Sequence, residues 1–339
     1  MNKIIKKITA VALSAVLVGG CLAGCTSKGT EESEKKTAFK VGICQLMQHD
    51  ALDAATKGFQ DKLNELAAEN GITIEYDVQN ASGDSAACAT IANQFVSNQY
   101  DLIMANATPA LQACATATAA SKTPVVATSV TDFGVALGIE MASTDATGIN
   151  VTGTSDLVSL ESQAQQILDL FPDTKKVGCI YCSAEANSQY QVDGVKKTLE
   201  ANGVECNFYS FADSNDIQTV VNKAAAESDA IYIPTDNTAA SNGSIISAAC
   251  KEANVPIIAG EEGIFKNTNA VATLSLSFYD IGSEAGEMAF DILVNGTDPA
   301  TMNIRLTDKL TYLYNEDVVK GFGITVPENY TAYDFTKAE

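Results

Sequence analysis

The sequence predicts an α/β fold made of two doubly wound lobes, each with a parallel sheet. Three observations lead to this prediction. The 339 residues exceed the usual length of a single domain and suit two compact units. Hydrophobic residues make up 46% of the chain and aromatic residues 7%, with no Trp, which is typical of a soluble α/β core. Short β-rich runs alternate with longer helical patterns, and this alternation occurs twice.

The first series of alternating elements starts at Phe39. Its expected elements, in chain order, are a strand at Phe39–Gln45, a helix at Leu52–Asn70, a strand at Ile72–Val78, a helix at Ser85–Asn98, a strand at Leu102–Ala105, a helix at Pro109–Ser121 and a strand at Val125–Thr128. The pair Asn70-Gly71 marks a helix end, because glycine after a helix accepts left-handed dihedral angles.

The second series starts with a helix and has a similar length. Its expected elements are a helix at Leu157–Leu170, a strand at Lys176–Cys182, a helix at Ser188–Asn202, a strand at Glu205–Phe211, a helix at Ile217–Glu227, a strand at Ala230–Pro234, a helix at Thr238–Ala253 and a strand at Pro256–Ala259. Ligands of open parallel sheets bind outside the carboxyl ends of the strands, so the loops at those ends are the candidate functional segments.

The N-terminus has the three-part pattern of an export signal. Lys3, Lys6 and Lys7 precede the uncharged stretch Ile8–Ser27, which starts with an apolar block and continues with small residues. The alternative is a membrane-spanning helix, for which about 20 apolar residues would suffice. Glycines interrupt the stretch and an acidic segment follows it, which favours the signal peptide, assigned to residues 1–24.

Leu22-Ala23-Gly24-Cys25 looks like a bacterial lipobox, in which the cysteine thiol receives a diacylglycerol. The polar residues 25–37 that follow are expected to form a flexible tether. The sequence therefore predicts a lipoprotein, acylated at Cys25 with chains such as palmitate, on the extracytoplasmic face of the cell membrane.

Charge and missing motifs exclude several functions. The chain has 21 Lys and Arg against 42 Asp and Glu, a net charge of −21 that repels a phosphate backbone, so no nucleic-acid partner is expected. His49 is the only histidine, which excludes multi-histidine metal sites, and neither a metal nor a cofactor is expected. Nucleotide-binding and hydrolase motifs are absent. A carboxylate-pair hydrolase remains an alternative, and its candidate acids are Asp132, Asp156, Asp236 and Glu261. Binding without catalysis is favoured over this alternative.

Nine cysteines in an exported chain raise the question of disulfides. Two lie in the signal region, and the others are scattered singly in apolar contexts, where a thiol packs as a small hydrophobic group. Cys179 and Cys182 have redox spacing, but they fall within an expected strand, where residues three apart point to opposite faces. A dithiol or metal site is therefore not expected at this pair.

Polar loops follow the expected strands of both series. In the first series they include Gln45–Asp50, Asn106–Pro109 and Ser129–Phe133, and in the second Ser183–Ser188, Thr235–Thr238 and Gly260–Gly263. Any one of these side chains is more readily a helix N-cap than a ligand contact. Together they indicate a polar cleft shared by two lobes.

Several segments resemble a known family. Gln45–Asp53 (QLMQHDALD), followed by Gly58-Phe59, resembles the Q-x-x-x-H-P-A-L-D-x-x-x-x-G-F opening of the ABC-transporter substrate-binding proteins of the tryptophan/tyrosine type. Further segments agree in order, and the likeness runs from about Phe39 to Pro327; these segments are Asn80–Asp84, Asp101–Ile103, Ala107–Ala110, Val130–Asp132, Asn150–Asp156 and Ile231–Asn237. Asp50 and Phe133 stand where the family usually has proline.

The resemblance implies a type I periplasmic-binding-protein fold, with two lobes joined by three crossovers near Ser155, Ser275 and Arg305. The N-terminal lobe would comprise residues 38–155 plus 276–305, and the C-terminal lobe residues 156–275 plus 306–339. The last long helix, Gly282–Asn295, would return to the first lobe. The implied partners are an ABC permease and its ATPase.

The resemblance also implies a small ligand between the lobes, commonly an aromatic amino acid. A zwitterion needs an anion site and a cation site. Helix N-termini at Thr108, Ser155 or Asn187 could bind the carboxylate, and Asp132, Asp156 or Asp236 the ammonium group; His49 would either contact the ligand as a cation or pack against the following helix. The remaining predicted ligand-binding residues are Gln45, Thr131, Phe133, Asn237 and Glu261.

Phe133, Phe278, Phe265 and Tyr181 are the candidates to pack on an apolar ligand side chain. Two alternatives stay open at this point. One is a type I binding protein for a sugar or a branched-chain amino acid. The other is a sensory lipoprotein that passes its ligand to a receptor rather than a permease.

Overall fold

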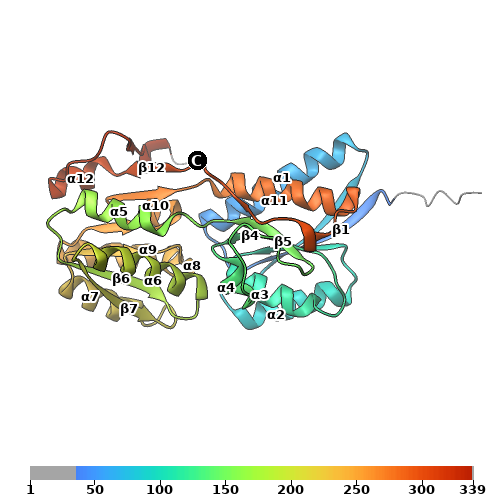
Figure 1. Cartoon of the computed structure of the whole chain (residues 1–339), viewed down its shortest axis with the longest axis horizontal. Coiled ribbons are helices and arrows are strands. Elements are labelled where there is room, and N and C mark those ends of the chain that lie inside the picture. Colours follow the sequence, from blue (N-terminus) through green and yellow to red (C-terminus); the bar gives the residue numbers. More distant parts are fainter. Residues whose placement is uncertain (1–35, 338–339) are drawn as a thin grey trace, which may run out of the picture. The chain divides into compact units, whose positions relative to one another are not determined.

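The computed structural model describes residues 36–337. The predicted signal peptide 1–24 and the lipidation residue Cys25 lie outside the described residues, as does nearly all of the predicted tether 25–37. Within the described part, helices alternate with strands in two sheets, the first parallel and the second parallel except for one pair (Figure 1). None of the helices in residues 36–337 is both long and apolar enough to span a membrane.

The first sheet has six strands in the order β11-β5-β4-β3-β1-β2, and all of its pairs are parallel. Its elements, with the helices between them, are β1 (Ala38–Gln45), α1 (Asp50–Glu69), β2 (Thr73–Asn80), α2 (Ser85–Ser97), β3 (Leu102–Asn106), α3 (Thr108–Thr118), β4 (Val125–Val130), α4 (Phe133–Leu137), β5 (Val151–Ser155), α11 (Phe278–Asn295), a 3-10 turn η1 (Pro299–Thr301) and β11 (Arg305–Leu306).

The second sheet has seven strands in the order β13-β12-β10-β9-β8-β6-β7. Its elements, in chain order, are α5 (Leu160–Leu170), β6 (Lys176–Cys182), α6 (Ala186–Ala201), β7 (Glu205–Phe211), α7 (Ile217–Glu227), β8 (Ala230–Ile233), α8 (Asn237–Ser241), α9 (Gly243–Ala253), β9 (Ile257–Ala259), α10 (Glu262–Asn267), β10 (Ala272–Ser275), β12 (Thr311–Tyr314), α12 (Glu316–Phe322), β13 (Thr331–Ala332) and η2 (Phe335–Lys337).

Each sheet is covered on both faces by helices, so its strands are almost continuously apolar. In the first lobe α1 and α11 pack on one face and α2, α3 and α4 on the other (Figure 1). In the second lobe α5 and α6 pack on one face and α7, α8 and α9 on the other. These two cores in each lobe contain most of the buried side chains.

The cysteines of the described residues lie in these cores as free thiols. Cys179 and Cys182 on β6 enter different cores on opposite faces of the second sheet, as the strand pattern predicts. Cys179 instead neighbours Cys206 on β7, with 3.2 Å between the sulfur atoms. The neighbouring thiol of Cys206, followed by burial, raises the pKa of Cys179.

The chain passes between the sheets at three places. It leaves the first sheet after Ser155 and the second after Ser275, and it passes from β11 to β12 between Leu306 and Thr311. The helix α11 that follows the second passage packs against α1, on the first sheet. Its buried face is in contact with β4 and β5, so this C-terminal helix completes the first lobe.

Two local predictions differ from the structure. The single helix expected at Thr238–Ala253 is two helices, because Asn242 leaves the helical region at φ −119° and ψ 22° and joins α8 to α9. The second sheet also contains one antiparallel pair, β10 with β12, in a segment for which the sequence pattern predicted no strand. All other pairs of this sheet are parallel.

The contact between α1 and α11 depends on glycine. A Cβ atom on Gly282 would lie 2.0 Å from the carbonyl oxygen of Ala55, and one on Gly58 would lie 2.1 Å from that of Tyr279. Contacts this short cannot be relieved by a rotamer change, because the colliding atoms belong to the backbone. The two helices can approach only where these positions lack a side chain.

We therefore expect Gly282→Ala to lower the free energy of unfolding by about 1 to 3 kcal/mol or more, the usual cost of overpacking a core. Gly321→Ala in α12 is the matched control, because nothing lies within 4 Å of the added Cβ. Alanine is the better helix former, so this control should be neutral or stabilising by up to about 1 kcal/mol. Denaturant unfolding of both variants tests the contact, and equal stabilities would contradict it.

Candidate functional site

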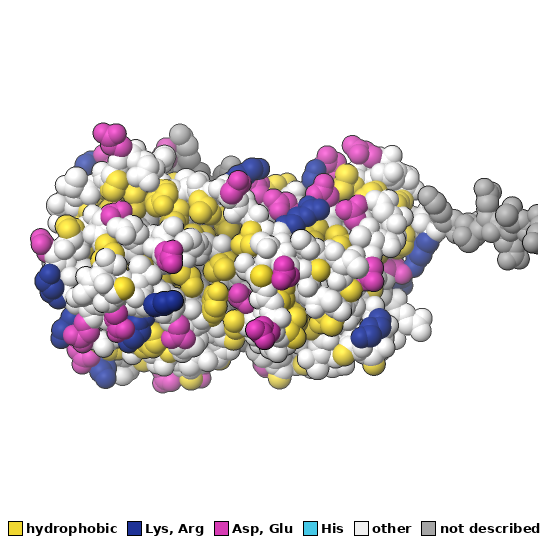
Figure 2. All heavy atoms as spheres, viewed as in Figure 1, with side chains coloured by type: hydrophobic (Ala, Val, Ile, Leu, Met, Phe, Trp, Pro, Cys, Tyr) yellow, Lys and Arg dark blue, Asp and Glu magenta, His cyan; other side chains and the backbone are white. Residues whose placement is uncertain are grey.

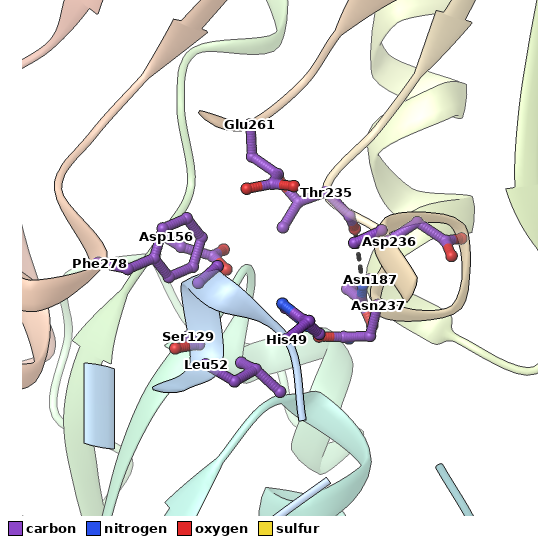
Figure 3. Close-up of a pocket in the computed structure, with 12 residues that line it drawn as sticks. His49, Leu52, Ser129, Asp156, Asn187, Thr235, Asp236, Asn237, Glu261 and Phe278 are labelled. Carbon is purple, nitrogen blue, oxygen red and sulfur yellow. Dashed lines mark hydrogen bonds between the residues drawn. The ribbon is translucent and has the colours of Figure 1, made fainter. Parts of the chain in front are cut away.

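A small polar cavity lies at the carboxyl ends of the strands of both sheets (Figure 3). Its walls come from the end of β4 and the segments that follow β1 and β5 in the first lobe, from the segments that follow β6, β8 and β9 in the second, and from the start of α11. The lining residues are His49, Ala51, Leu52, Ser129, Asp156, Asn187, Thr235, Asp236, Asn237, Ala240, Glu261 and Phe278. This is the position at which parallel sheets bind ligands.

Half of the predicted site residues line this cavity, and half do not. Those that line it are His49, Asp156, Asn187, Asp236, Asn237 and Glu261. The six that the structure places elsewhere are Gln45, Thr108, Thr131, Asp132, Phe133 and Ser155, all of which except Asp132 are buried. Their side chains form hydrogen bonds or pack within the first lobe, or lie at its border with the second lobe.

Hydrogen bonds within the first lobe account for three of these six residues. The Gln45 amide donates to Asp53 at 2.6 Å and accepts from Thr56 at 2.6 Å, which ties the end of β1 to α1. Asp132 accepts from the backbone N–H of Val135 and so caps α4. The Ser155 hydroxyl donates to the carbonyl oxygen of residue 131.

Thr108 is buried at the start of α3, and Phe133 lies in the core beneath α4. Thr131 meets the second lobe, where its hydroxyl oxygen lies 3.5 Å from the amide nitrogen of Gln191. Each of these residues was predicted from its loop position, and packing places its side chain away from the cavity.

Phe278 is the one of the four aromatic candidates that lines the cavity, beside Asp156 in Figure 3. Phe265 packs in the core of the second lobe, and Phe133 in that of the first. The Tyr181 hydroxyl donates to Gln189, and its ring lies in the core beneath α5 and α6.

The buried acids of the second lobe are saturated by backbone N–H groups. Asp236 accepts from Cys182 at 2.6 Å and from Ala239 at 2.8 Å, and its carboxylate turns away from the centre of the cavity in Figure 3. Glu261 accepts from the N–H groups of Gly263 and Ile264. Burial still raises the pKa of Glu261 to about 7 and, with the nearby Glu185, raises that of Asp236.

Asp156 differs from these acids, because its Oδ1 atom is buried without a hydrogen-bond partner. The residue follows β5 directly, is 4% exposed and points into the cavity beside Phe278 (Figure 3). Burial raises its pKa to about 6, against the opposing effect of a hydrogen bond from Thr131. An unpaired buried carboxylate oxygen is costly unless a donor binds to it.

His49 stands at the entrance to α1 and reaches across to the second lobe. Its Nε2 atom lies 3.0 Å from Oδ1 of Asn237, and its Nδ1 atom is buried without a partner. Burial lowers the pKa of the imidazole, which favours the neutral ring over the cation that one of the two sequence-based alternatives required.

Asn187, a predicted binding residue, also has a buried atom without a partner, its Oδ1. Ser129 and Thr235 line the cavity but were not predicted as binding residues, and the Ser129 hydroxyl is likewise buried without a partner. Ser129 adopts a left-handed conformation at φ 56°, a strained geometry of the kind often found at functional sites, and no sequence pattern signals it. Glu185, 4% exposed, is a further buried acid behind the cavity.

The cavity is closed by contacts between the lobes. One is the contact between His49 and Asn237, and another is the hydrogen bond that the Ser241 hydroxyl donates to the Met47 sulfur at 2.9 Å. The enclosed volume is about 10 Å³, close to the minimum for one water molecule. A second cavity of about 270 Å³ is lined by the next residues of the same segments, Met47 and Thr238, and by Glu185.

Charges are scattered over the molecular surface in Figure 2, with Lys and Arg interspersed among Asp and Glu rather than gathered into a basic patch on this face. Within residues 36–337, no group of three or more His, Cys, Asp or Glu side chains is arranged to hold a metal ion. The unpaired polar atoms of the cavity are therefore the strongest indication of a ligand.

Comparison with known protein families agrees with this geometry. Residues 40–337 match the model of the ABC transporter substrate binding protein family. The chain belongs to this family. The match covers both lobes and all the residues of the cavity, so the fold is that of a type I periplasmic binding protein.

Individual relatives support the assignment. The chain is 34% identical to a tyrosine-binding protein of Clostridioides difficile over 93% of its own length and 92% of that protein. It is also similar to an ABC domain from Streptococcus pneumonia solved in complex with L-Trp, with 30% identity, a TM-score of 0.79 and coverage of 86% of this chain and 99% of that one. A ligand-free, open substrate binding protein with adhesive properties from Clostridium difficile matches with 34% identity and a TM-score of 0.66, over 87% of this chain and 99% of that one.

The isolated charge of Asp156 leads to a stability prediction for the ligand-free protein. A carboxyl group whose pKa rises on folding favours the folded state below its unfolded pKa of 3.8, and this contribution is lost as the pH rises through about 6. Asp156→Asn should therefore be more stable than wild type at pH 7.5 by roughly 3 kcal/mol, and this advantage should shrink toward pH 4.

Denaturant unfolding at pH 4.5 and 7.5 measures this difference, with Glu252→Gln, a change at an exposed acid, as the control. The control should shift stability by less than about 0.5 kcal/mol at either pH. A pH-independent difference between wild type and Asp156→Asn would show that the buried charge is not the cause.

Proposed function

We propose that this protein is an extracytoplasmic solute-binding lipoprotein of an ABC importer, and that it binds an aromatic amino acid between its lobes without turning it over. The observation that carries the proposal is the set of four buried, unpaired polar atoms that face one cavity: Oδ1 of Asp156, Oδ1 of Asn187, Nδ1 of His49 and Oγ of Ser129. Buried polar atoms are normally paired, so four at one place indicate a polar ligand.

The chemistry of these atoms favours an ammonium group. Asp156 and Asn187 present acceptor oxygens, and the neutral form of His49 has one unprotonated ring nitrogen. An ammonium group offers three N–H donors, and its positive charge would pair with the negative charge of the Asp156 carboxylate. The Ser129 hydroxyl can then donate to the ligand carboxylate. Asp156, rather than Asp132 or Asp236, is thus the proposed partner of the ammonium group.

The volume of the cavity implies that the lobes separate when the ligand enters. About 10 Å³ cannot hold an amino acid, so the contact between His49 and Asn237 that closes the cavity would have to open for a ligand to enter. A ligand that binds both lobes then favours the closed arrangement by its differential affinity.

An aromatic side chain suits the apolar part of the wall. Phe278, Leu52, Ala51 and Ala240 also line the cavity. The names of the relatives, tyrosine-binding and in complex with L-Trp, support the same class of ligand. L-tyrosine and L-tryptophan are therefore the first probes to use.

The import role is supported by the family to which the chain belongs, whose members deliver a substrate to an ABC transporter. The N-terminal sequence supports anchoring of the protein outside the cytoplasm, through diacylglycerol on Cys25 and a tether of residues 25–37. The partners would then be the permease and the ATPase of that transporter.

Binding of L-tyrosine or L-tryptophan should depend on the ionised form of Asp156. The pKa of this group is about 6 in the free protein, so affinity should be constant above pH 7 and should fall about tenfold per pH unit below pH 6 as the carboxylate is protonated. Asp156→Asn should weaken binding at pH 7.5 by on the order of a hundredfold and should remove this slope. Calorimetry between pH 5 and 8 measures both effects.

Asp132→Asn is the matched control, since Asp132 caps α4 outside the cavity and asparagine is an equally good N-cap. Its affinity should stay within about threefold of wild type. If Asp156→Asn binds as tightly as Asp132→Asn, the ammonium site lies elsewhere. Conversion of either amino acid into a new product would contradict the binding function itself.

Replacement of Cys25 by Ala tests the anchor. Two or three acyl chains hold a protein on a membrane, whereas the unmodified chain has no such anchor, so Cys25→Ala should move the protein from the membrane to the soluble fraction. Cys21→Ala, four residues earlier, is the control and should leave the distribution unchanged. Membrane retention of Cys25→Ala equal to that of wild type would overturn the lipobox assignment.

A further inference from the structure

Glu185 is a buried carboxylate that does not line the small cavity but is hydrogen-bonded to Asn237, which does. It precedes α6 and receives four hydrogen bonds from the start of α8. Its Oε2 accepts from the backbone N–H of Asn237 at 3.1 Å and from the Asn237 amide at 2.6 Å. Its Oε1 accepts from the backbone N–H of Thr238 at 2.9 Å and from the Thr238 hydroxyl at 2.8 Å.

These bonds determine which way the Asn237 amide faces. An ionised carboxylate can only accept hydrogen bonds, so the NH₂ group of Asn237 must point to Glu185. Oδ1 of Asn237 is then turned toward the first lobe, where it lies 3.0 Å from Nε2 of His49. The orientation of this amide therefore follows from the charge of Glu185 rather than from a choice between two equivalent rotamers.

The same reasoning determines the proton position on His49. The amide oxygen of Asn237 can only accept, so Nε2 of His49 must carry the hydrogen. In the neutral ring Nδ1 then has a free lone pair. That atom is buried without a partner in the described protein and belongs to the cavity wall.

We propose that Glu185, acting through Asn237, holds His49 in the Nε2–H tautomer and so makes Nδ1 the third acceptor for the ammonium group of the ligand. The proposal rests on the proposed function, which places that ammonium group beside Asp156. Three N–H donors then meet Oδ1 of Asp156, Oδ1 of Asn187 and Nδ1 of His49. Glu185 is a positioning residue, since it acts through Asn237 and does not line the small cavity.

The neutral ring is essential to this arrangement, because a protonated Nδ1 would point an N–H group at the ammonium. The acids that favour protonation are Asp50 and Asp53 on α1 and Glu185 across the cleft, and Asp156, Asp236 and Glu261 also line the cavity. Burial opposes them and lowers the pKa of His49 overall. The tautomer is therefore best measured above neutral pH.

The chain offers a clean test, because His49 is its only histidine. The full chain labelled with ¹⁵N-histidine gives one pair of ring nitrogen signals, and their shifts identify which nitrogen carries the proton. In the ligand-free wild type at pH 8 we expect an unprotonated Nδ1 and a protonated Nε2. In Glu185→Gln the Asn237 amide can turn over, so both signals should move toward the average of the two tautomers.

Thr238→Val is the matched control, because it removes one hydrogen bond to Glu185 without involving Asn237. Its histidine signals should match those of wild type. If Glu185→Gln does not fold, Asn237→Ala removes the acceptor for Nε2 and should produce the same averaging. A protonated Nδ1 in wild type, or wild-type signals in the folded variants, would overturn the proposal.

Affinity supplies the second readout. Glu185→Gln should weaken binding of L-tyrosine and L-tryptophan by about tenfold or more, the value of one hydrogen bond to a charged group, whereas Thr238→Val should stay within about threefold of wild type. Loss of binding equal in both variants would indicate a merely structural role and overturn the positioning role. Wild type that binds neither amino acid would contradict the proposed function, while the tautomer of the free protein would remain measurable.

Discussion

The structure around the cleft depends on how buried carboxylates obtain hydrogen-bond donors away from water. Asp236 and Glu261 obtain theirs from backbone N–H groups at the starts of α8 and α10, and Glu185 from Asn237 and Thr238. These bonds shape the loops of the second lobe. Asp156 is the exception, because Oδ1 of its carboxylate has no partner. The acid that the fold leaves with an unpaired oxygen is therefore the one that we propose as the ligand contact.

The topology explains why this site needs both lobes. Parallel strands bring all their carboxyl ends to one edge, so each sheet contributes a row of loops, and the three passages of the chain join the two sheets. The return of α11 to α1 completes the first lobe and positions Phe278, the first residue of that helix, in the cavity wall. Gly58 and Gly282, which permit this close contact, thus help to position Phe278 although they do not line the cavity.

The sequence predicted the alternation of elements and the edge of the sheets where the site lies, because periodicity and loop polarity are local signals. It could not distinguish a helix cap from a ligand contact: Asp132 and Asp156 both follow strands, yet Asp132 caps α4. Phe133 was misplaced because core packing, not loop position, decides where an aromatic ring points. Ser129 has no sequence signal, since its backbone conformation is set by the surrounding fold.

The cost of an unpaired buried charge explains how such a site discriminates between ligands. In the proposed function, a ligand with an ammonium group would supply the missing donor for Asp156, whereas a ligand of the same shape without it would leave the carboxylate oxygen buried and unpaired. A ligand that leaves a buried polar atom of the site without a partner loses much affinity. One additional apolar contact changes affinity much less, so unpaired polar atoms discriminate more strongly between ligands than apolar contacts do. Under the proposed function, the specificity of this cleft would reside in the polar atoms that the ligand-free protein leaves without partners. The same unpaired carboxylate is predicted to lower the stability of the ligand-free protein, so ligand recognition and lower stability would have one physical cause.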